Sequence, residues 1–215
     1  MSLLDRFKRV FSAAKADSTV QATPDQREEI LTILREHISR DVRGGFLDEE
    51  EIIEGCVDCF ADEYDEASLR KHVPVLTREL LAAHQKEQAT WPNPTDCDRL
   101  DRTLDELEKS GIVCRQDFSC CGTCGSAEIW AEIEQADAAG SKSRGYLFYH
   151  AQDTESAVEN GSLYFNYGST EEGPEPSLAI ANEIQSALQH NGFPVQWNGK
   201  LEQRIGIQLD WKKRR

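Results

Sequence analysis

The sequence predicts an α+β fold, with a helical N-terminal region followed by a ferredoxin-like two-layer sandwich that carries one extra hairpin strand. Apolar residues recur at helical spacing between residues 24 and 90. After Gly111 we expect the order strand, helix, strand, strand, helix, strand, which matches the split β-α-β pattern of ferredoxin-like folds. The last strand alternates apolar and polar residues, which indicates one buried face.

Three amphipathic helices are expected before residue 90. The first begins at Thr23 and Pro24, a cap followed by a favoured first helical residue, and it ends at the glycines of "RGGF". The second lies in "LDEEEIIEGCVDCFADEY", whose acidic first turn suits the positive end of the helix dipole. The third spans about 66–89. Such helices can form a small bundle or cover a sheet.

The prolines of "WPNPT" mark a boundary near residues 91–95. We therefore expect an amphipathic helix and flexible linker over 1–23, a helical region over 24–90 and the sandwich over 91–215. Residues 3–11 place their apolar side chains on one helical face, so contact with a membrane surface is one interpretation. Docking of this helix on its own protein is the favoured one.

The elements of the sandwich follow from caps, alternation and turns. Thr95 and Asp98 resemble a capping box that begins a helix ending at Gly111. The Asn198-Gly199 pair is the strongest short hairpin signal and joins the two last strands, "PVQW" and "RIGIQLDW". The other expected elements are strands over 112–118, 145–150 and 162–168, helices over 126–139 and 177–191, and a short helix in "DTESAVEN".

Composition excludes several classes of function. The net charge of −15 and the pI of about 4.8 repel nucleic acid, whose binding depends on clustered basic residues. No apolar run approaches the roughly 20 residues that span a bilayer, and charges interrupt the N-terminus where a secretory signal would be apolar. Seven unevenly spaced cysteines without such a signal indicate reduced thiols in a cytoplasmic protein.

The residues that could bind a ligand or react lie at one edge of the predicted sheet. A helix joins the first two strands, so these strands should be parallel and their C-terminal ends should meet at one edge. "CCGTC" follows the first strand and "HAQDTE" begins at the end of the second. Ligands often bind at such an edge. The candidate binding residues are Cys120, Cys121, Cys124, His150, Gln152 and Asp153.

Zinc is the one cofactor that these residues could hold, and no other cofactor is expected. Cys121 and Cys124 have the C-x-x-C spacing that lets two thiolates bind one tetrahedral ion, and His150 could join them. Structural zinc sites usually have a second such pair. The only other one, Cys56 and Cys59, looks helical, and Cys56 falls in an apolar stripe, where a free cysteine behaves as a small hydrophobic residue.

Two further interpretations of "CCGTC" remain open. A thiol where a strand ends and a helix begins has a lowered pKa, as in redox dithiols, although the terminal hairpin does not match a thioredoxin fold. A hydrolase that uses Cys121 with His150 and Asp153 has only thin support. The simplest interpretation is a tight turn, in which Gly122 and Gly125 permit positive φ and small side chains allow close packing.

The C-terminal half resembles a family of bacterial proteins known only as a domain of unknown function. The motifs that carry the resemblance are "WPNPTDCDRL", "GIVCRQDFSCCGTCG", "GYLFYHAQDTE" and "RIGIQLDWKKRR". It covers residues 90–215 well and the helical half more loosely. It implies that "FSCCGTCG" and "HAQDTE" belong to the family pattern, whereas Cys56 and Cys59 are peculiar to this chain, and it brings no activity with it.

The favoured function is therefore that of a non-enzymatic binding or interaction protein, with a small ligand, an ion or a protein partner at the "CCGTC"/"HAQDTE" edge. The alternative is a thiol-based redox enzyme or a zinc-dependent enzyme that uses Cys121, Cys124 and His150.

Overall fold

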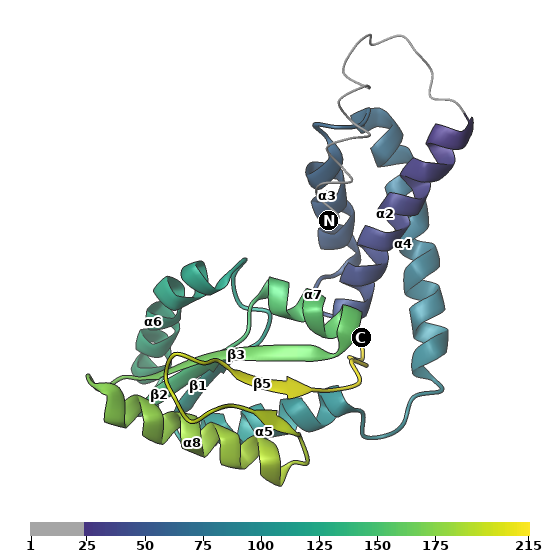
Figure 1. Cartoon of the computed structure of the whole chain (residues 1–215). Helices are drawn as coiled ribbons and strands as arrows, with labels where there is room; N and C mark the ends of the chain where they lie inside the picture. The colour runs from purple at the N-terminus through teal and green to yellow at the C-terminus, as the bar shows by residue number, and fades with distance from the viewer. Residues whose placement is uncertain (1–23) are drawn as a thin grey trace. The chain divides into compact units, whose positions relative to one another are not determined.

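The α+β class is confirmed by the computed structural model, which describes residues 24–215 (Figure 1). The amphipathic helix expected at 3–11 and the linker after it lie outside the described residues. Two compact units make up the described part, one of residues 24–42 and 46–86 and the other of residues 43–45 and 87–215. None of the helices between residues 24 and 215 combines the length and apolar character that crossing a bilayer requires.

The three helices predicted for the first unit are present. They are α2 (Pro24–Gly44), α3 (Glu49–Phe60) and α4 (Glu66–Gln88). Asp48 begins α3 with a reciprocal capping box, because its carboxylate accepts the Glu51 amide at 2.9 Å and its own amide donates to the Glu51 carboxylate at 2.7 Å. The helices share one apolar core, formed by Leu34, Ile38, Val42, Ile52, Cys56, Val57, Phe60, Leu69, Val73 and Leu76.

The second unit is a five-stranded mixed sheet with its helices. In chain order it contains α5 (Asp96–Lys109), β1 (Ile112–Arg115), α6 (Gly122–Ala138), β2 (Gly145–Phe148), α7 (Ala151–Asn160), β3 (Ser162–Ser169), α8 (Pro174–His190), β4 (Val195–Gln196) and β5 (Ile205–Gln208). β1 and β2 are parallel, as predicted, and they are direct neighbours, with Val113 opposite Tyr146. The predicted hairpin of β4 and β5 is also present.

The strand order differs from the ferredoxin-like prediction. The order is β1-β2-β3-β5-β4, and β3 pairs antiparallel with both β2 and β5. In a split β-α-β arrangement another strand would lie between β1 and β2, whereas here these two strands are hydrogen-bonded neighbours. β3 pairs antiparallel with the other side of β2, so β1 lies at the edge of the sheet beside β2.

Helices cover both faces of the sheet, so the arrangement is three layers rather than the predicted two. Figure 1 shows α6 and α7 on one side of the sheet and α5 and α8 on the other. Ile129 of α6 packs with Val113 and Phe148 on one face. On the opposite face a Cβ on Gly145 would lie 2.8 Å from the Ile180 side chain of α8. The alternation of apolar and polar residues in β5 indicated only one buried face. Gly206 on the other face is buried as well, so the sequence pattern did not predict helices on both faces.

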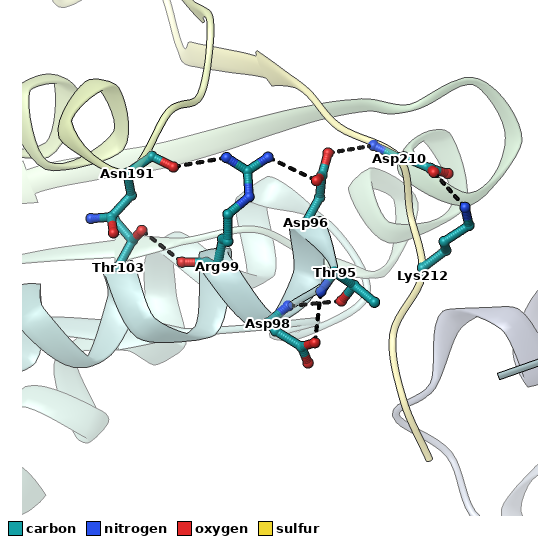
Figure 2. Close-up of polar contacts among 8 residues, drawn as sticks. All are labelled: Thr95, Asp96, Asp98, Arg99, Thr103, Asn191, Asp210 and Lys212. Carbon is teal, nitrogen blue, oxygen red and sulfur yellow. Dashed lines mark hydrogen bonds and ion pairs between the residues drawn. The ribbon is translucent and has the colours of Figure 1, made fainter. Parts of the chain in front are cut away.

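Helix α5 is tied to the end of α8 and to the chain after β5 (Figure 2). The predicted capping box is confirmed, since the Asp98 amide donates to the Thr95 hydroxyl at 3.1 Å and the Thr95 amide donates to the Asp98 carboxylate at 2.8 Å. Arg99 donates to Asp96 at 2.7 Å and to the Asn191 carbonyl at 3.0 Å. Asp96 also accepts the amide of Asp210 at 3.0 Å. These contacts fix α5 against both segments.

Candidate functional site

The loop between β1 and α6 presents the cysteines from a constrained backbone. Asp117 and Ser119 have φ angles of +50° and +66°, in the left-handed region that costs a residue with a side chain about 1–2 kcal/mol. Hydrogen bonds across the sheet edge hold them there. The Phe118 amide donates to the Tyr149 carbonyl at 2.9 Å, and the Ala151 amide donates to the Ser119 carbonyl at 3.1 Å. Non-glycine residues in this conformation often accompany functional sites.

The three cysteines of this loop converge. The sulfurs of Cys120, Cys121 and Cys124 all lie within 4.8 Å of one another. Cys120 is exposed and the other two thiols are half-buried, and none is in a disulfide. The sequence placed Cys121 and Cys124 together by their spacing, and the structure brings the preceding residue into the same group. We call these three residues the thiol cluster.

Cys121 and Cys124 differ in pKa because of their positions at the start of α6. Cys121 is the N-cap of α6, with an extended backbone at φ −159°. The amide and the thiol of Cys124, together with the Thr123 amide, lie near the Cys121 sulfur and lower its pKa, because they favour its thiolate. The pKa of Cys124 is raised to about 11, because its proton is shared with the sulfurs of Cys120 and Cys121. The cluster therefore contains one thiol that ionises readily and one that does not.

Close packing at this turn depends on Gly125. Left-handed φ values were expected at Gly122 and Gly125, but both are ordinary helical residues of α6, and the left-handed conformations occur earlier in the loop. The expected close approach is correct for Gly125, where a Cβ would lie 2.5 Å from Cε2 of Phe148. A Cβ on Gly122 would make only ordinary contacts, at 3.5 Å from the His150 ring.

His150 and Asp153 lie directly beside the thiol cluster. His150 is the N-cap of α7 and is 6% exposed, and the Cδ2–Nε2 edge of its ring faces Gly122. Nε2 is 3.1 Å from the Asp153 carboxylate, which also accepts the His150 amide at 3.2 Å and the guanidinium of Arg204. Burial lowers the pKa of His150, and the positive charge of Arg204 acts in the same direction, so its ring is neutral near pH 7.

Gln152 lies apart from this network. Its side chain is exposed on α7, and its carbonyl accepts the Ser156 hydroxyl at 3.1 Å. The structure therefore gathers five of the six candidate residues in one neighbourhood, and it places the sixth on the outer face of α7.

Sequence reasoning missed Asp117, Asn166 and Arg204. Asp117 accepts the Thr154 hydroxyl at the start of α7, and its pKa is raised by burial. Asn166 lies on the strand next to β2, opposite Phe148. Arg204 precedes β5 and reaches Asp153, 51 positions earlier. The pairing of β3 with β2 and with β5 brings Asn166 and Arg204 here, and no local pattern encodes that pairing, whereas Asp117 already lies in the loop between β1 and the cysteines.

The neighbourhood contains several buried polar atoms without a partner. Among the described residues, His150 Nδ1, Asn166 Nδ2 and Arg204 Nε are buried and make no hydrogen bond. Native proteins leave few such atoms, and a group of them is more typical of a functional site than of a core.

Three of the remaining four cysteines, Cys56, Cys97 and Cys114, are buried, and Cys59 is exposed. Cys56 belongs to the apolar core of α2–α4, and burial raises its pKa to about 12. Burial also raises the pKa of Cys97 to about 12 and that of Cys114 further. Cys59 is exposed, and burial of its sulfur raises its pKa as well. Within residues 24–215 only the thiol cluster groups three metal-binding side chains closely, so a second cysteine pair has no support.

A family model described as "Domain of unknown function (DUF6891)" matches residues 27–215. The chain belongs to the DUF6891 family. This confirms the resemblance detected in the C-terminal half and extends it through the helices of the first unit. No curated protein and no solved structure matches the chain.

Two kinds of chemistry are open to this DUF6891 protein at the thiol cluster. Three converging sulfurs are a suitable donor set for a thiophilic metal ion. A readily ionised thiol at a helix N-terminus, three residues from a second thiol, is also the arrangement of a redox dithiol. In either case the His150 ring lies beside Gly122 of the thiol loop, and Asp153 holds that ring through Nε2.

Proposed function

We propose that this DUF6891 protein binds one thiophilic metal ion at Cys120, Cys121 and Cys124. The convergence of the three sulfurs within 4.8 Å carries the proposal. Two thiolates on one tetrahedral ion, each about 2.3 Å from it, lie roughly 3.8 Å apart. The sulfurs would thus have to approach by only about 1 Å, which rotation of their side chains can supply.

The surroundings of the cluster favour bound thiolates. The first amides of α6 point toward Cys121 and stabilise negative charge there. The hydrogen bonds of Phe118 and Ala151 fix the loop before an ion arrives, which reduces the entropy cost of binding. The exposure of Cys120 leaves the cluster open to an ion from solution.

Metal titration tests the proposal. Reduced, metal-free protein should bind one equivalent of zinc or cadmium, and the cadmium complex should show thiolate-to-metal absorption in the ultraviolet. Replacing Cys124 with serine should lower the affinity about a hundredfold, because even loss of a group that only supports a metal ligand costs about 10- to 100-fold. Affinity would be measured by competition with a chromophoric chelator.

Cys59→Ser is the matched control, since Cys59 is a free thiol exposed on α3. It should bind zinc as the parent protein does. Failure to bind either ion, or an equal loss of affinity in the Cys124→Ser and Cys59→Ser variants, would show that the cluster is not a metal site.

A dithiol exchange function is the second candidate, and the opposite pKa shifts of Cys121 and Cys124 favour it. The Cys121 thiolate would attack a substrate disulfide and form a mixed disulfide, releasing one substrate thiolate. Cys124, losing its proton to solvent, would then attack Cys121, and the second substrate thiolate would leave as the Cys121–Cys124 disulfide forms. The substrate disulfide is reduced by two electrons and the protein dithiol is oxidised by two.

Alkylation of the metal-free protein should modify Cys121 first. Because its pKa lies below that of an ordinary thiol, about 8.5, its reaction with iodoacetamide should persist at pH values where ordinary thiols are protonated. Peptide mapping after brief labelling would identify the modified residue, with Cys59, whose pKa is raised, as the slowly reacting internal reference. If Cys121 reacts no faster than Cys59 as the pH falls, the dithiol function is wrong.

A further inference from the structure

The thiol cluster lacks a fourth protein ligand. Within residues 24–215 no histidine, carboxylate or further cysteine has a ligand atom that joins the group formed by the three sulfurs. Zinc in structural sites almost always has four ligands in a tetrahedron. An ion held only by residues 24–215 would therefore have three ligands.

His150 is the nearest candidate for a fourth ligand, and its geometry opposes that role. The ring edge that faces the loop carries Nε2, which is hydrogen-bonded to Asp153 at 3.1 Å. Nδ1 lies on the opposite side of the ring from this edge. Turning Nε2 to an ion would remove a partner from the Asp153 carboxylate, which is only 4% exposed. His150 is therefore a positioning residue that supports the loop.

The carboxylates of Asp153 and Asp117, near the loop, already accept hydrogen bonds from other residues. Asp153 receives the His150 amide and the Arg204 guanidinium on the same oxygen that faces the ring. Asp117 accepts the Thr154 hydroxyl. Neither belongs to the group of converging ligand atoms, so no oxygen donor of the described residues completes the set.

We infer that the occupant of the thiol cluster is a univalent soft ion, Cu(I), bound by three thiolates in a trigonal arrangement. This inference rests on the proposed metal-binding function and names its ion. Soft thiolate donors select Cu(I), and Cu(I) is satisfied by three of them, whereas zinc would have to recruit a ligand from solution. The ion enters and leaves as Cu(I), so no electron transfer is involved.

Anaerobic loading with Cu(I), followed by X-ray absorption at the copper edge, tests the inference on the unmodified chain. The expected result is one Cu(I) per chain with three sulfur neighbours and no nitrogen or oxygen neighbour. The zinc-loaded protein should show the three sulfurs and one oxygen from solvent or buffer. Excess zinc should fail to displace Cu(I), while stoichiometric Cu(I) should displace zinc.

Cys120→Ser distinguishes the three-thiolate site from one built of Cys121, Cys124 and His150. Because Cys120 is exposed, the substitution should leave the fold intact. It should lower the affinity for Cu(I), measured against a chromogenic Cu(I) chelator, at least about tenfold. Cys59→Ser should leave this affinity unchanged.

The outcomes separate the inference from the function on which it rests. A nitrogen neighbour in the copper or zinc complex, only two sulfurs on Cu(I), or an unchanged affinity in Cys120→Ser would show that the three-thiolate Cu(I) site is wrong while metal binding stands. If the protein binds neither zinc, cadmium nor Cu(I), the proposed function itself fails.

Discussion

Replacing Gly125 with alanine is expected to lower the free energy of unfolding by about 2 kcal/mol. The added methyl group would lie 2.5 Å and 2.9 Å from two ring carbons of Phe148, far inside normal contact distance. Phe148 is fully buried and packs against the rings of Phe118 and Tyr146, so it has no room to retreat. Overpacking of this kind costs up to about 3 kcal/mol, and the better helix propensity of alanine returns about 1 kcal/mol.

Gly122→Ala is the matched control in the same turn of α6. Its added methyl group would make contacts of 3.5 Å or more, so the free energy of unfolding should not fall, and the helix propensity of alanine should raise it by up to about 1 kcal/mol. Urea denaturation followed by circular dichroism would measure both variants. Equal stabilities of the two would contradict the close packing of α6 on β2.

Local signals in the sequence predicted most individual elements correctly. The capping box of Thr95 and Asp98 depends on a few adjacent residues. The hairpin of β4 and β5 is present, but its connection spans residues 197–204 and is longer than the tight turn expected at Asn198-Gly199. The parallel direction of β1 and β2 follows from a general rule for strands joined by a helix. The order of the later strands depends on the direction in which α7 returns the chain, and that direction is decided by packing between distant residues.

The same difference between local signals and long-range packing applies to the candidate site. The thiol loop and His150 were placed at one sheet edge because each directly follows a strand. Cys120 was predicted as a binding residue but not as a metal ligand, since the direction of its sulfur depends on the left-handed backbone at Ser119. Arg204 could not be placed either, because its contact with Asp153 requires β5 to pair with β3. Spacing identifies which residues can meet in one loop, whereas sheet register decides which distant residues join them.

Replacing Asp153 with alanine is expected to lower the free energy of unfolding by about 3 kcal/mol. The carboxylate lies at 4% exposure and accepts hydrogen bonds from the His150 amide, the His150 ring and Arg204. Its loss leaves the two His150 donors without a partner, while Arg204 still donates to the Tyr164 carbonyl, and each unsatisfied buried donor costs about 1–3 kcal/mol. The Arg204 side chain is 36% exposed, so solvent screens part of its loss and the total stays below the value for a fully buried ion pair.

Asp153→Asn and Arg204→Met resolve the contributions to this effect. Asparagine keeps an acceptor oxygen for the His150 amide, so it should cost about 1 kcal/mol, less than alanine. The double variant Asp153→Ala/Arg204→Met should be more stable than the sum of the single losses predicts, because removing both partners leaves no unpaired charge beside His150. Denaturation midpoints of the four proteins, measured in urea at neutral pH, give the coupling energy. If the losses of unfolding free energy in the two single variants add exactly in the double variant, Asp153 and Arg204 stabilise the protein independently. The carboxylate would then act on the thiol loop through His150 alone.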